Sequence, residues 1–127
     1  MIKGLGTDIV EIQRIKKICS TSFGDNFIRR ILTDEEIKEM QQKSPEKQNE
    51  FLAGRWAAKE AVAKALGCGI GGRCSFLDLH IINNDAGAPE LHFTGDAADE
   101  LRSKGASTCH ISISHEIHYA TAVAIIE

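Results

Sequence analysis

No run of apolar residues in this 127-residue chain approaches the roughly 20 residues that a membrane-spanning helix needs. The first residues, from Met1 to Gly4, lack the apolar segment of a secretory signal peptide, so we expect a cytoplasmic protein with no membrane association. Excess positive charge is also missing. The net charge is −3, which gives no global reason to expect nucleic acid as a partner, and any basic surface must be local.

The four cysteines form no CxxC pair, which is typical of reduced and mostly buried thiols. Cys109, His110, His115 and His118 are close in sequence, but their spacing matches none of the familiar zinc sites. Apolar and polar residues alternate over residues 110–115, and this pattern predicts a strand rather than a zinc site.

Internal repeats, low-complexity tracts and linker-like segments are absent as well, so we expect one domain over residues 1–127. Hydrophobic residues make up 43% of the chain and charged residues 26%, a composition that supports a sizeable core.

The chain is organised around residues 45–66, where alanine dominates, and alanine is the residue that costs least in a helix. Ser44 and Pro45 fit the N-cap and the first helical position, and Gly67 fits a left-handed C-terminal cap. Because apolar residues nearly encircle this segment, we predict a long central helix that is largely buried.

Two pairs of charged residues lie four positions apart on this helix: Arg55 with Lys59, and Glu60 with Lys64. One interpretation is ordinary surface ion pairing, which within these pairs only the oppositely charged Glu60 and Lys64 can form. The other is a carboxylate ligand flanked by cations that meet phosphate oxygens, and this second interpretation needs another acid.

Asp8 is the candidate for that second acid. It lies near the end of a short strand predicted over residues 2–10, in which Gly4 and Gly6 allow another backbone or a ligand to come close. A carboxylate in this position suits a metal ion, but it could equally cap the helix that follows.

Basic residues gather in residues 14–30, where Asp25 is the only acid. The five are Arg14, Lys16, Lys17, Arg29 and Arg30. They lie on two short predicted helices, and they form either ordinary solvated faces or a docking surface for an acidic protein.

The rest of the chain alternates between further predicted elements. Thr33 and Glu36 fit a capping box. Strands are predicted over residues 76–83, 90–93, 108–114 and 119–126, and a helix over residues 96–104. In the last strand, Ala120, Ala122 and Ala124 share one face, which predicts close packing against a helix or a neighbouring subunit.

Two features could serve a ligand or simply the fold. The glycine-rich residues 67–72 follow a helix instead of preceding one, so they are neither a P-loop nor a dinucleotide fingerprint. They form either a flexible turn or a loop that lies against an extended ligand. His115, at a strand end, either binds phosphate or has a structural role.

Six blocks together resemble one known family. They are Gly6-Thr7-Asp8 followed by Arg14; residues 27–33 with Glu36; residues 51–61; residues 67–71; Gly87-Ala88-Pro89; and residues 112–115. In this order they resemble the holo-[acyl-carrier-protein] synthase group of 4′-phosphopantetheinyl transferases over essentially the whole chain. Cys68 departs from the pattern, because that family has threonine-like residues at its position.

The resemblance implies an α+β fold in which a long central helix packs on a small antiparallel sheet, assembled as a homotrimer with active sites at subunit interfaces. It implies that 4′-phosphopantetheine passes from coenzyme A to a serine of apo acyl carrier protein, leaving adenosine 3′,5′-bisphosphate. Asp8 and Glu60 would hold Mg²⁺, and Lys64 would stabilise charge on the phosphates. Either Glu60 or a metal-polarised water would take the proton of the serine.

The resemblance also implies binding roles. For coenzyme A these involve Arg55, Lys59 and His115 at the nucleotide, Gly67, Gly69 and Gly71 along the pantetheine arm, and Pro89 near the adenine. For the acidic carrier protein, the local basic charge makes Arg14, Lys17, Arg29 and Arg30 the candidate docking residues. Two other classes stay open: a non-catalytic module that binds acidic partners, and a metal-dependent phosphohydrolase that uses the same carboxylates.

Overall fold

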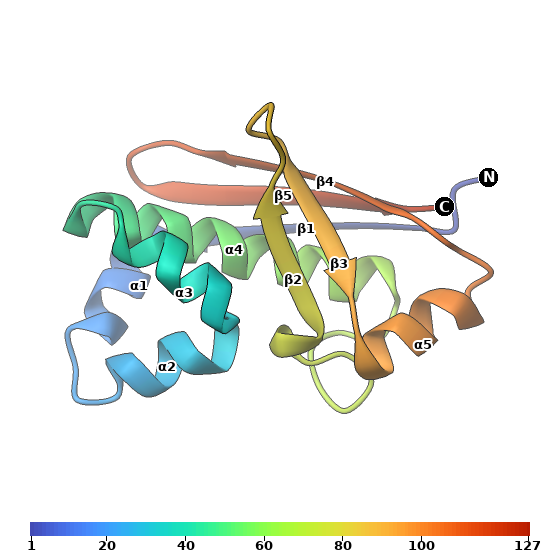
Figure 1. The fold of residues 1–127 in the computed structure, drawn as a ribbon, viewed down its shortest axis with the longest axis horizontal. Helices are drawn as coiled ribbons and strands as arrows, with labels where there is room; N and C mark the ends of the chain where they lie inside the picture. Colours follow the sequence, from blue (N-terminus) through green and yellow to red (C-terminus); the bar gives the residue numbers. More distant parts are fainter.

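The computed structural model describes residues 1–127, and Figure 1 follows the chain from blue to red. Its elements are β1 (Gly4–Glu11), α1 (Ile12–Cys19), α2 (Gly24–Ile31), α3 (Asp34–Gln41), α4 (Pro45–Ala65), the short 3₁₀ helix η1 (Phe76–Asp78), β2 (Leu79–Asn83), β3 (Pro89–Phe93), α5 (Gly95–Ser103), β4 (Cys109–His115) and β5 (Tyr119–Ile126). None of these helices carries a stretch long and apolar enough to cross a bilayer. The predicted α+β fold is confirmed.

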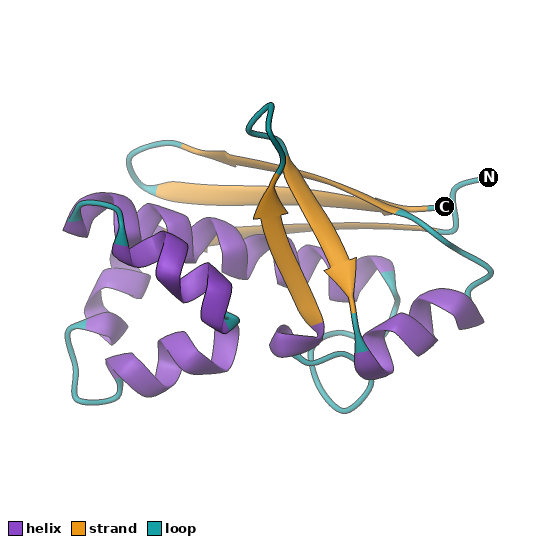
Figure 2. Cartoon of the chain, viewed as in Figure 1, coloured by secondary structure: helices purple, strands orange, loops and turns teal.

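Helix α4 is the long central helix that the sequence predicts. It packs along one face of a three-stranded sheet, while α1 to α3 gather near its first half (Figure 2). Pro45 is its first residue, and Gly67 ends the helical segment with a φ of +80°, a conformation that favours glycine. Its alanines, Leu52 and Val62 belong to one hydrophobic core.

The close contact between α4 and β1 depends on glycine. A Cβ atom added to Gly4 would lie 2.1 Å from the carbonyl oxygen of Ala65, and one added to Gly6 would lie 1.9 Å from that of Ala61. The prediction that these glycines let another backbone come close is therefore confirmed, and the backbone is that of α4.

The three strands of this sheet are antiparallel and run in the order β1-β5-β4, so β5 is the middle strand. Ala120, Ala122 and Ala124 are buried on its inner face, against the helix, as their spacing predicts. The outer face carries exposed apolar side chains instead, namely Leu5, Ile9, Tyr119 and Val123.

Strands β2 and β3 form a separate antiparallel hairpin in which Asn83 is opposite Pro89. The prediction of one strand over residues 76–83 is wrong in its first part. Ser75 and Asp78 form a capping box that winds residues 76–78 into η1, and the strand begins at Leu79.

Asp8 does not cap the following helix. It lies inside β1, paired with Ala122, and the residue at the N-cap of α1 is Glu11, which makes no side-chain capping bond. The capping interpretation is therefore wrong, and the carboxylate of Asp8 is available for another purpose.

Candidate functional site

The three candidate catalytic residues meet in one cavity, which we call the carboxylate cavity. It has a volume of about 450 Å³ and lies between β1, α1 and α4. Its lining residues are Asp8, Ile9, Val10, Glu11, Arg14, Trp56, Glu60, Lys64 and Tyr119. The fold thus brings Asp8 from the sheet to Glu60 and Lys64 on the helix.

Asp8 is engaged by a lysine within this cavity. The ammonium group of Lys64 donates to Oδ1 of Asp8 at 2.9 Å and to the carbonyl oxygen of Thr7 at 3.0 Å. Lys64 therefore pairs with the strand, and not with Glu60 four residues earlier on its own helix, so the prediction of an ordinary helical pair is wrong here.

Glu60 is held by an aromatic neighbour that the sequence analysis did not single out. Nε1 of Trp56 donates to Oε1 of Glu60 at 3.2 Å. The indole ring packs edge-on against Phe27, with ring centroids 5.4 Å apart, and the guanidinium group of Arg14 lies 5.5 Å from its centroid. The i, i+4 spacing of Trp56 and Glu60 was the signal that could have identified this contact.

A smaller apolar cavity of about 220 Å³ adjoins the carboxylate cavity and shares Trp56 and Glu60 with it. Its other lining residues are Phe27, Arg30, Ile31, Ile70 and Phe76. Ile70 belongs to the glycine-rich loop, so this loop borders the predicted site of chemistry. Gly69 and Gly71 have open space around their Cα atoms, and Gly69 has a φ of +67°.

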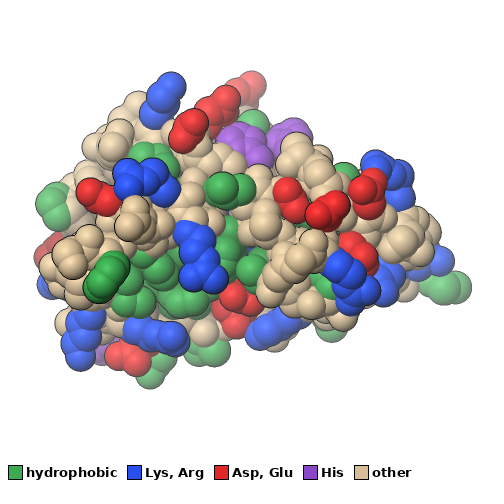
Figure 3. All heavy atoms as spheres, turned by 90° about the horizontal axis from the view of Figure 1, so that it is seen from below, with side chains coloured by type: hydrophobic (Ala, Val, Ile, Leu, Met, Phe, Trp, Pro, Cys, Tyr) green, Lys and Arg blue, Asp and Glu red, His purple; other side chains and the backbone are tan.

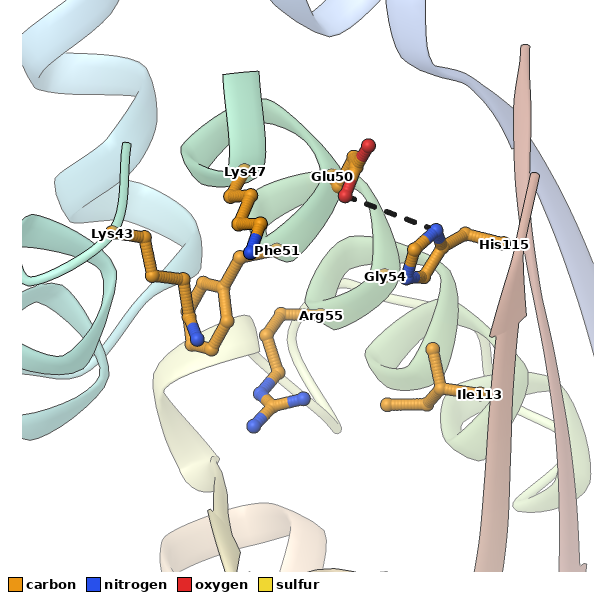
Figure 4. Close-up of a pocket in the computed structure, with 8 residues that line it drawn as sticks. All are labelled: Lys43, Lys47, Glu50, Phe51, Gly54, Arg55, Ile113 and His115. Atoms are coloured by element: carbon orange, nitrogen blue, oxygen red, sulfur yellow. Dashed lines mark ion pairs between the residues drawn. The ribbon is translucent and has the colours of Figure 1, made fainter. Parts of the chain in front are cut away.

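Arg55 and His115 meet elsewhere, in a second cavity that we call the basic cavity. It has a volume of about 390 Å³ and lies between the first half of α4 and the end of β4 (Figure 4). Its lining residues are Lys43, Lys47, Glu50, Phe51, Gly54, Arg55, Ile113 and His115.

Arg55 is fixed in this cavity by several contacts. Its guanidinium carbon lies 4.5 Å from the centroid of the Phe51 ring, its Nη2 donates to Oδ1 of Asn83 at 3.3 Å, and Glu39 lies 3.9 Å away. Burial lowers the pKa of this arginine, and the nearby carboxylates of Glu39 and Glu36 oppose the shift. The side chain is only 8% exposed, and its buried Nε has no hydrogen-bond partner.

Two lysines add positive charge beside Arg55. Lys43 lies 5.4 Å from the Phe51 ring, and Lys47 also lines the cavity, while Glu50 is 3.9 Å from His115 (Figure 4). Neither lysine was predicted as a site residue from the sequence. The signal was present, because Lys47, Phe51 and Arg55 recur every four residues on one face of α4.

Lys59 requires a correction. Its ammonium group donates to Oε1 of Glu36 and to the carbonyl oxygen of Ile31, both at 2.7 Å, and its side chain has no exposed surface. A group enclosed in this way has no contact with either cavity, so Lys59 has a structural role and does not bind the nucleotide.

The other predicted binding residues lie at the margins. Pro89 lines neither cavity. It is opposite Asn83 in the hairpin, and the side-chain oxygen of Asn83 accepts the hydrogen bond from Arg55. Arg14 lines the carboxylate cavity, and Arg30 lines the apolar one. Arg29 donates a hydrogen bond to the side chain of Asn26. These three arginines and Lys17 are all exposed to solvent. On the face shown in Figure 3, Lys and Arg side chains surround hydrophobic ones in the half that contains α1 and α2.

The donor set of the carboxylate cavity fits a hard divalent cation. Mg²⁺ takes one or two carboxylates and completes its coordination with water and with phosphate oxygens of a substrate. Asp8 and Glu60 supply two carboxylates, and the cavity already places one cationic group, the ammonium of Lys64, against Asp8.

Comparison with known proteins shows the family of this chain. The family model of the 4′-phosphopantetheinyl transferase superfamily matches residues 4–123, and the chain belongs to this superfamily. Within it, the chain is 46% identical to the holo-[acyl-carrier-protein] synthase of Idiomarina loihiensis over 126 residues, which are 99% of this chain and 97% of that one. It is 48% identical to the enzyme of the same name from Shewanella baltica, again over 99% and 97%.

Solved structures of such synthases share the fold. The one from Neisseria meningitidis has a TM-score of 0.90 at 40% identity and covers 100% of this chain and 99% of its own. The one from Bacillus anthracis, in complex with CoA (3′,5′-ADP), has a TM-score of 0.84 at 39% identity, covering 99% and 96%. The one from Helicobacter pylori, in complex with coenzyme A, has a TM-score of 0.83 at 34% identity, covering 97% and 99%.

Proposed function

We propose that this chain is a holo-[acyl-carrier-protein] synthase. It transfers 4′-phosphopantetheine from coenzyme A to a serine of apo acyl carrier protein and releases adenosine 3′,5′-bisphosphate. The observation that carries this proposal is the meeting of Asp8, Glu60 and Lys64 in one cavity of a chain with full-length synthase relatives. The full-length synthase relatives disfavour the phosphohydrolase, and a simple binding module needs no such constellation.

The residues of the carboxylate cavity have different roles in the proposed reaction. Asp8 and Glu60 would hold Mg²⁺, which when bound neutralises the pyrophosphate of coenzyme A and orients it. Lys64 stabilises the charge that develops during phosphoryl transfer. Glu60 also lies at the border of the apolar cavity, where it can accept the proton of an incoming serine hydroxyl.

The basic cavity suits the nucleotide end of coenzyme A. Arg55 brings a guanidinium group to this cavity for a phosphate, and Lys43, Lys47 and His115 add donors around it. The pantetheine arm would then follow the loop of Gly67, Gly69 and Gly71 beside the apolar cavity, whose lining is mostly hydrophobic.

The two halves of this site belong to different subunits in our proposal. The carboxylate cavity is lined by β1 and the basic cavity by β4, and these are the two outer strands of the sheet, with β5 between them and α4 beneath. One coenzyme A molecule could not fill both cavities of one chain without passing around this layer. The basic cavity of one subunit placed against the carboxylate cavity of the next makes a complete site.

A homotrimer with such sites is supported by the outer face of the sheet. Leu5, Ile9, Tyr119 and Val123 expose between 40% and 63% of their surface there, and Thr7 and Thr121 lie among them. An exposed face of this kind, mostly apolar, is typical of an interface between copies of a small chain.

Mixed assemblies test this division. Asp8→Ala subunits and Arg55→Glu subunits, each inactive alone, are co-expressed with different tags and purified through both. If the halves come from different subunits, about a third of the interfaces in the mixed trimers combine two intact halves and activity returns. A preparation that contains both subunits and stays inactive would place the whole site in one chain.

Acyl carrier proteins are strongly acidic, and we propose that they dock on the exposed side chains of Arg14, Lys17, Arg29 and Arg30. Arg14 and Arg30 also line the carboxylate and apolar cavities, so a partner bound there would lie next to Glu60. We further propose a cytoplasmic location, which the four unpaired cysteines support.

The function is tested by measuring release of adenosine 3′,5′-bisphosphate from coenzyme A and Mg²⁺, with and without apo carrier protein. We expect the nucleotide only when apo carrier is present. Equal release without carrier would indicate the phosphohydrolase, and no release in either case would indicate the binding module.

A further inference from the structure

We propose that Lys64 is an exchangeable counter-cation of Asp8. It neutralises this carboxylate in the free chain, and it is released toward the phosphates of the substrate when a divalent cation takes its place. This inference rests on the magnesium site of the proposed function, and it assigns to Lys64 a second role that precedes the chemistry.

The contact itself is asymmetric. Asp8 is mostly enclosed, with 18% of its side chain exposed, whereas Lys64 keeps 51% of its side chain in solvent. A carboxylate with so little access to water needs a positive partner. The lysine loses little by leaving, because about half of its side chain is already in contact with solvent.

Lys59, five residues earlier on the same helix, is an example of a lysine that is permanently paired with a carboxylate. Its ammonium group makes two bonds of 2.7 Å, and both it and its partner Glu36 are fully buried. Lys64 makes bonds of 2.9 and 3.0 Å to Asp8 and to the Thr7 carbonyl, at the open rim of a cavity. One helix therefore carries a locked lysine and a displaceable one.

Displacement has a direct consequence for substrate binding. Two of the three N–H groups of Lys64 are occupied by Asp8 and Thr7 in the free chain, and its charge is balanced by the carboxylate. A second cation at Asp8 repels the ammonium and removes this balance. Lys64 then has free donors and a free charge, so it can attract a phosphate only after the cation has bound.

Manganese binding to the chain without coenzyme A tests the exchange, with Mn²⁺ followed by electron paramagnetic resonance. Because Lys64 competes for Asp8, we expect Lys64→Met to bind Mn²⁺ about two- to five-fold more tightly than the wild type, the range for a partly exposed ion pair. Unchanged or weaker binding would overturn the proposal.

Arg14→Met is the matched control. Arg14 lines the same cavity and carries the same charge, but it stacks over Trp56 and makes no ion pair with Asp8. If Arg14→Met strengthens Mn²⁺ binding as much as Lys64→Met does, the effect is general electrostatics and not exchange. Asp8→Ala should weaken Mn²⁺ binding strongly, and if it does not, the proposed metal site itself is wrong.

A second measurement follows coenzyme A instead of metal. Lys64→Met should weaken coenzyme A binding when Mn²⁺ is present and leave it nearly unchanged when Mn²⁺ is absent, because only the released lysine meets phosphate. Trp56, the one tryptophan of the chain, is bonded to Glu60 and reports binding by its fluorescence. An equal loss in both conditions would contradict the exchange.

Discussion

The ammonium group of Lys59 lies 2.7 Å from Oε1 of Glu36, and neither side chain is exposed to solvent. Glu36 also accepts from the backbone N–H groups of Thr33 and Ile81, so one carboxylate joins the start of α3, the middle of α4 and strand β2. Because Glu60 is the next residue along α4, this buried contact helps to fix the direction in which the candidate catalytic side chain points.

Lys59→Met should therefore destabilise the fold and not merely weaken substrate binding. It leaves Glu36 as a buried charge without its cation, and breaking such a pair costs about 3–5 kcal/mol. Urea unfolding measures the loss. Lys16→Met, at an exposed position on α1, is the control and should change stability by about 0.5 kcal/mol or less. A loss below about 1 kcal/mol for Lys59→Met would contradict the structural role.

Gly6→Ala tests the contact between β1 and α4. Its new Cβ atom would lie 1.9 Å from the Ala61 carbonyl oxygen, and a backbone atom cannot move aside as a side chain can. We therefore expect the free energy of unfolding to fall by about 1–3 kcal/mol or more. Gly72→Ala is the matched control, because no atom lies within 4 Å of a Cβ added to Gly72 and the φ of this residue is not positive. Equal melting temperatures for the two variants would show that β1 can move away from α4 without cost.

Much of this fold follows from local patterns in the sequence. Alanine content and caps predict α4, the Thr33 capping box predicts α3, and alternation predicts β4 and β5. These patterns succeed because they depend on near neighbours. The 3₁₀ turn at residues 76–78 was missed because alternation alone does not register a cap made by Ser75 and Asp78.

The site was harder to predict because its contacts join distant segments. Spacing alone made Lys59 and Lys64 look alike, yet one pairs with Glu36 in the core and the other with Asp8 in a cavity. Neither partner is on the same helix, so no helical pattern could assign them. The separation of Arg55 from Glu60 into two cavities likewise depends on the order of strands in the sheet.

Kinetics should separate the two cavities. Lys64→Ala is expected to lower kcat more than it raises the KM for coenzyme A, because its charge matters most as charge develops on the phosphates. Arg55→Ala is expected mainly to raise that KM, because it would hold a part of the donor that does not react. Steady-state rates over a range of coenzyme A concentrations decide this, and the opposite pattern would exchange the two roles.

Charge reversal tests the docking face. Arg14→Glu should raise the KM for the carrier protein and leave the KM for coenzyme A nearly unchanged, with an effect that shrinks as salt is added. The two KM values are compared at low and high ionic strength, with Lys38→Glu on α3 as a change of equal charge outside the basic group. If only the coenzyme A constant changes, Arg14 belongs to the nucleotide pocket and the carrier docks elsewhere.

The central claim is that Asp8 and Glu60 of this chain support transfer of phosphopantetheine to a carrier serine. Mass spectrometry of apo acyl carrier protein after incubation with coenzyme A, Mg²⁺ and the enzyme tests it most directly. We expect a mass gain of one phosphopantetheine on a single serine with the wild type, and none with Asp8→Ala or Glu60→Ala, both still folded by circular dichroism. Transfer at near wild-type rates by either variant at saturating Mg²⁺, or no gain with the wild type, would contradict the account.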